Sequence, residues 1–277
     1  MFWLLVCIFF IWASVDQGYV KLSTYLIIGG VIVLCAIVYG IHEHFASKKR
    51  AEESRERAKI AREEKRKREE AQKARETQEL SRLKANASRG GFDDILALAE
   101  WFEKHKQPQE ALRYYLKIAP SANSEVHRKI ARLYWNKDWN QTFQWMRKSA
   151  EEGNVDAQKD LGFLYEMGEG TPINYEKAIY WYKQAADNGD IGVNGGVSAT
   201  AKAAIGAVYA YKLNDYSKGF PWFLQAAKEG NDFAQEAVWG CYVYGRGVRQ
   251  NRSEAEKWKR KLLASGNHFP DEFVIYD

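Results

Sequence analysis

The sequence predicts an all-α fold, in which a transmembrane hairpin and a long charged helix precede a solenoid of about five helical hairpins. Three observations predict it. Two apolar runs lie within the first 45 residues, a charged run without Gly or Pro comes next, and most of the remaining chain repeats itself. The expected divisions are a membrane anchor over 1–45, a charged spacer and linker over 46–91, a repeat domain over 92–267 and a tail over 268–277.

The second apolar run, YLIIGGVIVLCAIVYGI at 25–41, contains no charged side chain. A helix of that length spans about 26 Å, near the lower limit for the hydrocarbon core of a bilayer. The run at 2–15 is shorter. We interpret it as the other arm of a membrane hairpin, with a cleaved signal peptide as the alternative.

The basic segment SKKR, at 47–50, follows the second apolar run, whereas the short connecting loop holds only Lys21. Cytoplasmic flanks of membrane segments carry an excess of Lys and Arg. We therefore expect an integral membrane protein of the bacterial inner membrane that contacts the lipid bilayer through its N-terminal segment. The repeat domain is expected on the cytoplasmic side.

The spacer is rich in both charges: residues 48–84 hold 15 Lys and Arg against 9 Asp and Glu. Opposite charges recur four residues apart, as in Glu63–Lys67, and each such pair stabilises a helix by about 0.2–0.5 kcal/mol. Its few apolar residues do not keep a heptad, so we expect one solvated helix without a coiled-coil seam. Residues 85–277 hold 25 charges of each sign, and a neutral domain is not expected to bind nucleic acid.

The rest of the chain repeats itself. The segment GNVDAQKDLGFLYEMGEGTPINYEKAIYWYKQAADNG at 153–189 matches GNDFAQEAVWGCYVYGRGVRQNRSEAEKWKRKLLASG at 230–266 at one constant offset and without a gap. Weaker copies lie at 98–119, 130–153 and 204–230. Apolar residues recur at i+3 and i+4, which predicts helices with one apolar stripe, and stacked hairpins can bury stripes that one hairpin cannot. The matched positions are Ala157/Ala234, Tyr165/Tyr242, Gly168/Gly245, Gly170/Gly247, Asn174/Asn251, Ala178/Ala255, Trp181/Trp258 and Gly189/Gly266.

Several local features follow from this alignment. Asn174 is expected to cap the second helix of its hairpin, and Gly189 to end that helix in a left-handed conformation. The copy at 204–230 lacks the Gly-x-Gly turn, so its two helices should join more tightly. Pro221 lies inside its expected second helix and predicts a kink or a late helix start.

The segment at 157–189 resembles a Sel-1-like repeat, a relative of the tetratricopeptide repeat. The alanine, Leu-Gly, tyrosine, Gly-x-Gly, tryptophan-tyrosine and Ala-Ala positions all match, and the resemblance extends over about 92–267. The segment at 230–266 departs from the pattern, with Val238-Trp239 where Leu-Gly is expected. The resemblance implies an α-solenoid that binds other proteins, and it does not imply catalysis.

No motif in the chain points to an enzyme. Gly168-x-Gly170 does not open a helix after a strand, and no Lys-Ser/Thr follows it, so it fails the tests for a phosphate-binding loop. The three cysteines and five histidines are scattered, which gives neither a disulfide framework nor a metal-binding spacing. We therefore expect no catalytic site, no cofactor, no metal and no small-molecule substrate.

The expected function is that of a membrane-anchored scaffold or adaptor that recruits a protein partner. In related solenoids the first helix of each hairpin lines the concave face. Arg128, Arg132 and Lys159 would form a basic clasp there for a peptide carboxylate, with ordinary solvated groove residues as the alternative. The alternative functions are a permanent structural subunit of a membrane or secretion assembly, and a quality-control adaptor of the envelope or secretory pathway. The candidate groove residues are Arg128, Arg132, Trp135, Lys159, Phe163, Glu166, Tyr211, Phe233 and Glu236.

Overall fold

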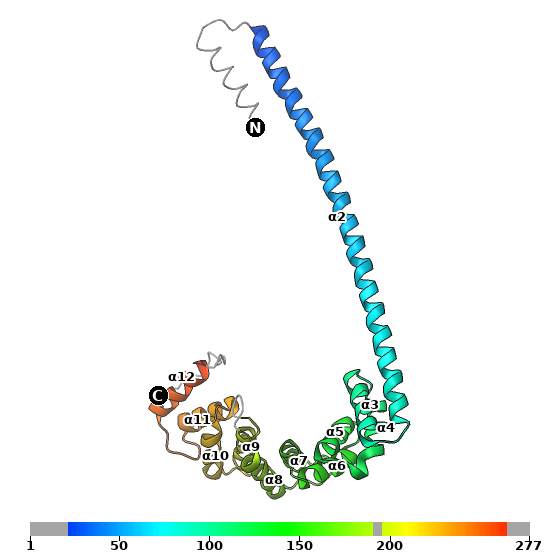
Figure 1. Ribbon diagram of the computed structural model, residues 1–277. Coiled ribbons are helices and arrows are strands. Elements are labelled where there is room, and N and C mark those ends of the chain that lie inside the picture. The colour runs from blue at the N-terminus through cyan, green and yellow to red at the C-terminus, as the bar shows by residue number, and fades with distance from the viewer. Residues whose placement is uncertain (1–21, 191–195, 265–277) are drawn as a thin grey trace. The chain divides into compact units, whose positions relative to one another are not determined.

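A computed structural model describes residues 22–190 and 196–264, and every regular element in those ranges is a helix (Figure 1). The expected apolar arm at 2–15 and the tail at 268–277 lie outside the described residues.

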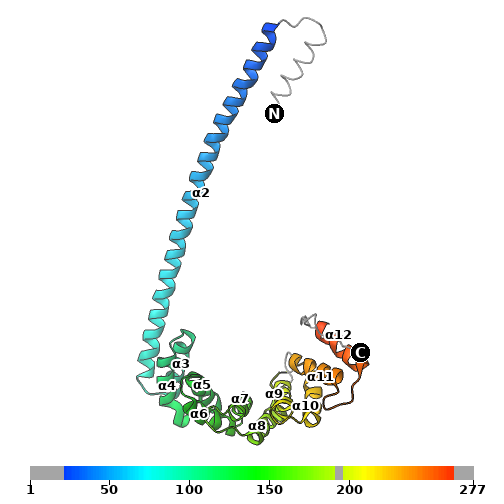
Figure 2. The same cartoon turned by 180° about the vertical axis from the view of Figure 1, so that it is seen from behind.

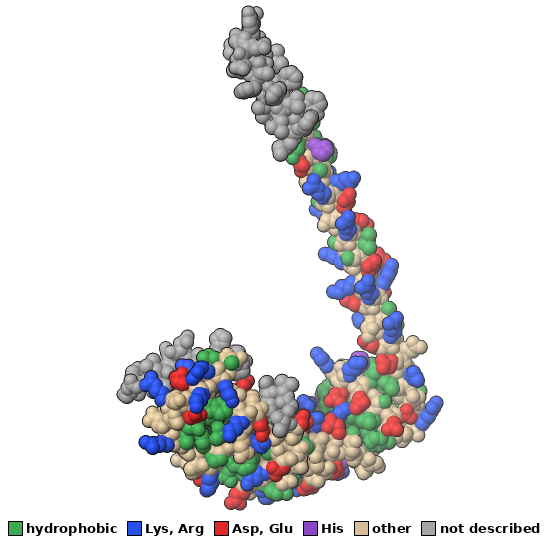
Figure 3. All heavy atoms as spheres, turned by 60° about the vertical axis from the view of Figure 1, so that its left-hand side comes forward, with side chains coloured by type: hydrophobic (Ala, Val, Ile, Leu, Met, Phe, Trp, Pro, Cys, Tyr) green, Lys and Arg blue, Asp and Glu red, His purple; other side chains and the backbone are tan. Residues whose placement is uncertain are grey.

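The first element, α2 (Leu22–Ala87), joins the second apolar run and the charged spacer into one helix of 66 residues. Among the residues that the structure describes, it is the one helix long and apolar enough to cross a membrane. Positive and negative side chains are interspersed along the part of α2 that follows the apolar run (Figure 3). Ion pairs form between residues four apart, such as Glu63 and Lys67 at 2.9 Å. The expectation of a single charged helix is therefore confirmed.

The chain divides within α2, between Glu79 and Leu80. Leu80, Leu83 and Ala87 pack against the core of the first hairpin. The last turns of the charged helix therefore belong to the repeat domain, because their apolar side chains are partly buried against its core.

Five helical hairpins follow, as the repeats predict. The first helices α3, α5, α7, α9 and α11 lie along the inner side of a curved row, with α4, α6, α8 and α10 outside them (Figures 1 and 2). The pairs are α3 (Phe92–Lys104) with α4 (Pro108–Ile118), α5 (Ser124–Tyr134) with α6 (Trp139–Glu151), α7 (Val155–Met167) with α8 (Tyr175–Asn188), α9 (Gly196–Ala207) with α10 (Tyr216–Lys228), and α11 (Asp232–Tyr244) with α12 (Arg252–Ala264). A short 3-10 turn, η1 (Ala119–Ser121), follows α4, and a π-helical turn, η3 (Val208–Lys212), continues α9.

The long sequence repeat is a repeat of structure. We call helices α6, α7 and α8 the first block, and helices α10, α11 and α12 the second block. Each helix of the second block begins at the same constant sequence offset from its counterpart in the first block that separates the two matching segments of sequence. An edge-to-face ring pair joins α6 to α7 in the first block and α10 to α11 in the second: Phe143–Tyr165 and Phe220–Tyr242, both with centroids 5.3 Å apart. The helix N-caps match as well, because their side-chain oxygens accept backbone N–H groups in both blocks. These caps are Asp138, Asn154 and Asn174 in the first block and Asp215, Asn231 and Asn251 in the second.

The Gly-x-Gly turns have a structural role. Gly168 and Gly245 end α7 and α11 in the left-handed conformation, as C-caps. A Cβ at Gly170 would lie 2.1 Å from the carbonyl oxygen of Trp139, and a Cβ at Gly247 would lie 2.1 Å from that of Tyr216. The second glycine of each turn therefore lets the backbone touch the start of the preceding hairpin's outer helix.

One local expectation is wrong, and of the kink or late helix start expected at Pro221 the late start is not observed. Gly189 has φ −80° and is not left-handed; its Cβ would lie 2.6 Å from the Ala185 carbonyl oxygen, so close backbone approach requires glycine there. Pro221 does not delay its helix, because α10 already begins at Tyr216. The tighter connection between α9 and α10 is confirmed, since only residues 213–215 separate η3 from α10.

Candidate partner-binding site

The nine candidate groove residues lie on, or directly after, the first helices of the second to fifth hairpins. Arg128 and Arg132 are on α5, Trp135 follows it, Lys159, Phe163 and Glu166 are on α7, Tyr211 is in η3, and Phe233 and Glu236 are on α11. The structure brings them into three separate environments.

The expected basic clasp is largely neutralised by the domain's own carboxylates. The Arg128 side chain is only 16% exposed and pairs with Glu125 at 3.1 Å and Asp156 at 3.8 Å. Burial is the largest single influence on the Glu125 carboxyl and acts to raise its pKa. The hydrogen bonds and charge of Arg128, the hydrogen bond from Asn154 and the charge of Lys129 together outweigh burial and hold that pKa below its usual value. Lys159 pairs with Asp160 at 3.4 Å, which leaves Arg132 as the exposed cation of the three. Partner binding by these residues stays a prediction.

The central candidates make contacts within the domain. Glu166 accepts a hydrogen bond from the Tyr182 hydroxyl at 2.9 Å and lies 4.0 Å from Lys212. Burial, reinforced by the Glu166 charge, raises the pKa of Tyr182, so its hydroxyl stays a donor. The ring of Phe163 stacks on Trp135 with centroids 6.1 Å apart. The Tyr182–Glu166 hydrogen bond thus links the two helices of one hairpin, and the Phe163–Trp135 contact joins two neighbouring hairpins.

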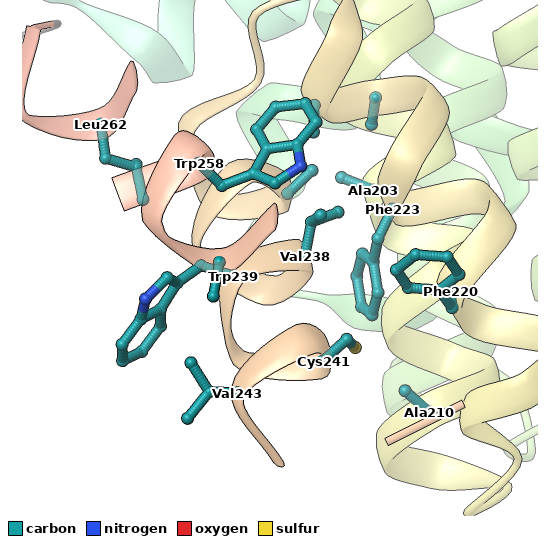
Figure 4. Close-up of a cluster of buried hydrophobic side chains, with 14 of the residues drawn as sticks. Ala203, Ala210, Phe220, Phe223, Val238, Trp239, Cys241, Val243, Trp258 and Leu262 are labelled. Carbon is teal, nitrogen blue, oxygen red and sulfur yellow. The ribbon is translucent and has the colours of Figure 1, made fainter. Parts of the chain in front are cut away.

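A pocket of about 210 Å³ opens in the second block, where η3, the start of α10 and α11 meet. We call it the aromatic pocket. It includes three of the candidate residues and adjoins the buried cluster in Figure 4, where Phe220 and Phe223 of α10 pack near Val238 and Cys241 of α11. Its lining residues are Tyr211, Tyr216, Phe233, Glu236, Ala237, Trp239, Gly240, Cys241, Tyr244 and Arg246.

The rings of this pocket support one another. Tyr211 meets Tyr216 edge to face with centroids 5.9 Å apart, and Phe233 meets the buried Phe223 in the same way at 6.0 Å. The Arg246 guanidinium lies over the rings of Tyr216 and Tyr244, at 5.5 and 5.2 Å. Such cation–π contacts fix a cation without using its N–H donors.

Two titratable groups of the pocket hold their protons at neutral pH. Burial raises the pKa of the Cys241 thiol to about 11, so the thiolate needed of a nucleophile is scarce at neutral pH. Burial also raises the pKa of Tyr211, and its hydroxyl remains protonated. Among the described residues, no group of three or more His, Cys, Asp or Glu side chains could hold a metal ion.

Seven lining residues of this pocket were not among the candidate groove residues: Tyr216, Ala237, Trp239, Gly240, Cys241, Tyr244 and Arg246. Tyr216 begins an outer helix and Arg246 lies in a turn, so neither belongs to the face of a first helix. Gly240 carried a usable signal, because the matched position in the first block holds Phe163. A Cβ at Gly240 would meet no atom within 4 Å, so the missing side chain leaves open space.

A family model described as Sel1 repeat matches residues 105–119, 137–154, 155–190, 208–231 and 239–267. Among solved structures, the chain is similar to a Sel1 repeat protein from Oxalobacter formigenes, with 25% identity, a TM-score of 0.52, and coverage of 64% of this chain and 74% of that one. It also shares its fold with c5321, a protective antigen of uropathogenic Escherichia coli, with 24% identity, a TM-score of 0.57, and coverage of 68% and 41%.

Curated relatives match over shorter segments. The chitin synthase regulator SKT5 of Saccharomyces cerevisiae is 34% identical over 87 residues, which are 29% of this chain and 12% of SKT5. The DAP3-binding cell death enhancer 1 of Rattus norvegicus is 27% identical over 169 residues, with coverage of 47% and 32%. The chain thus spans at most a third of the length of these two relatives. With five repeat matches and the shared solenoid fold, the chain belongs to the Sel1-like repeat family.

Proposed function

We propose that this protein is a membrane-anchored adaptor whose Sel1 repeats recruit a protein partner through the aromatic pocket. The observation that carries the proposal is the pocket itself, which gathers exposed rings on the inner helices of the solenoid. Tyr211, Phe233 and Tyr244 are exposed there, although soluble domains bury most side chains of this kind. Clustered exposed apolar side chains of this sort mark interaction sites.

The family supports the same role. Sel1 repeats typically mediate contacts between proteins, and the names of the two curated relatives describe proteins that regulate or bind another protein. The pocket offers rings and hydrogen-bonding groups but no activated nucleophile, which supports a non-enzymatic function.

The apolar part of α2 supports the membrane anchor. Val31, Leu34 and Val38 are exposed in the structure, and a bilayer would cover such side chains. The basic segment at 47–50 lies where cytoplasmic anionic lipid would meet it. We place the protein in the bacterial inner membrane, with the repeat domain in the cytoplasm.

The anchor and its orientation have a direct measurement. The full chain should stay with the membrane fraction after extraction with alkaline carbonate. A reporter enzyme active only in the cytoplasm, fused after the last residue, should be active, because the positive flank holds that side inside. Release by carbonate would contradict the anchor, and activity of a periplasmic reporter would contradict the orientation.

Partner capture tests the pocket. Phe233→Ala should reduce capture of the partner from native membranes by about thirtyfold, because truncation of a central interface ring commonly costs about 2 kcal/mol or more. The matched control is Tyr180→Ala on α8, since Tyr180 is 54% exposed and Phe233 50%, but Tyr180 lies outside the pocket. Equal capture by the two variants would contradict the proposed site. A chain that cannot be purified without its assembly would indicate a permanent structural subunit instead.

A further inference from the structure

Among the positions at which the two blocks differ, one carries a ring in the first block and lines the aromatic pocket in the second. Phe163 on α7 and Gly240 on α11 occupy the same place in matched helices, one in each block. In the first block the Phe163 ring stacks on Trp135. In the second block Gly240 lines the aromatic pocket, and no atom lies within 4 Å of the Cβ that a side chain would add. The second block therefore lacks a ring that the first block supplies from its own chain.

One part of the surroundings of this position is kept in both blocks, at the start of the outer helix. Trp139 and Tyr216 are the first residues of α6 and α10, and each receives the second glycine of the following turn against its carbonyl oxygen. Both positions carry an aromatic side chain beside the site. The aromatic side chain at the start of the outer helix is kept and the ring on the inner helix is lost, so the pocket offers aromatic neighbours to an incoming ring.

The charge at the edge of the site is reversed between the blocks. Glu169 in the first turn corresponds to Arg246 in the second. Arg246 already covers the faces of Tyr216 and Tyr244, so a second cation on these rings would be repelled. Within the described ranges its guanidinium pairs with no carboxylate, and its N–H edge can form a bidentate pair with an incoming one.

We propose that the aromatic pocket binds a partner segment that carries a Phe, Tyr or Trp side chain beside an Asp or Glu. The ring fills the space over Gly240, and the neighbouring carboxylate pairs with Arg246. Glu236, the carboxylate that lines the pocket, disfavours a second acidic residue on its own side and so helps to orient the segment. This inference rests on the proposed function and names the chemistry of the partner.

A random dodecapeptide display library, selected against the full chain in detergent, tests the proposal. Selected peptides should share an aromatic residue next to Asp or Glu. Gly240→Phe places a ring where the first block has one. It should lower the affinity of the chain for these peptides by about thirtyfold, as loss of a central anchor does. It should not lower the melting temperature, because glycine is the poorer helix former and the added ring enters open space.

Arg246→Gln should lower the affinity for the same peptides about tenfold, because it removes the cation that pairs with the peptide carboxylate. Arg249→Gln, in the same turn but outside the pocket lining, should leave binding unchanged. Selection of basic peptides, failure to select any peptide, or binding that survives Gly240→Phe would overturn the proposal. Selection of the expected peptides, with no partner captured from membranes, would instead remove the adaptor function and keep the pocket's chemistry.

Discussion

Gly247→Ala is expected to destabilise the repeat domain by more than about 4 kcal/mol, a loss that few single substitutions reach. The new Cβ would lie 2.1 Å from the carbonyl oxygen of Tyr216 and 2.4 Å from its carbonyl carbon. These are backbone atoms at the start of α10, so they cannot rotate away as a side chain can. Relief requires the turn after α11 to separate from α10, which opens the junction between two hairpins.

Gly245→Ala, two residues earlier in the same turn, is the matched control. Gly245 has φ 67° and Gly247 has φ 72°, so both substitutions carry the same left-handed strain of about 1–2 kcal/mol. The nearest atom to a Cβ at Gly245 is 3.5 Å away, an ordinary contact. Urea unfolding of the full chain, followed by circular dichroism, measures the difference. Equal losses for the two variants would contradict the role given to the second glycine.

Tyr182→Ala is expected to destabilise the domain by about 3–5 kcal/mol, the usual loss for a buried aromatic side chain. Tyr182 is 3% exposed, and its ring packs against Gly162. A Cβ added at Gly162 would lie only 2.7 Å from the ring carbon Cδ1 of Tyr182. Its hydroxyl also donates to Glu166. Tyr182→Phe keeps the ring and loses only this hydrogen bond, so it should cost about 1–2 kcal/mol.

A double-mutant cycle isolates the contact between this ring and the glycine. Gly162→Ala alone should be destabilising, since the packed ring cannot move, whereas Gly162→Ala in the Tyr182→Ala protein should cost little. Urea unfolding of the four proteins gives the coupling, and strict additivity would contradict direct contact. In the second block the aromatic residue of this pair stands on the other helix. Trp239 occupies the position matched to Gly162, and Lys259 occupies the position matched to Tyr182.

The helices and their five hairpins could be predicted because their signals are local. Apolar spacing selects one face of each helix, and the match between the two blocks carries caps and turns from one copy to the next. Gly189 could not be predicted in the same way, because its backbone lies against both the Ala185 carbonyl oxygen and Ser198, and Ser198 follows an insertion that other hairpins lack. Pro221 did not predict the start of its helix, since Asp215 caps α10 six residues earlier.

The candidate site could be predicted only in part, and for a related reason. Helix phase identifies the inner face, so Tyr211, Phe233 and Glu236 were found. The position of a residue on its own helix does not reveal a counter-ion that comes from the next hairpin. The ion pair between Arg128 and Asp156 could therefore not be predicted. Of the remaining pocket residues, Tyr216 comes from the start of an outer helix and Arg246 from a turn, and these meet the inner face only after the hairpins stack. The others lie on α11 itself, at positions that helix phase did not select.

Site-specific photocrosslinking in native membranes tests the central claim most directly. A photoreactive phenylalanine analogue placed at position 233 reports on the pocket, and the same analogue at position 180 reports on an exposed aromatic site outside it. We predict one discrete protein adduct at position 233, none at position 180, and loss of the adduct when Gly240→Phe fills the pocket. Adducts at both positions, or an adduct at 233 that persists with Gly240→Phe, would contradict recruitment through this pocket.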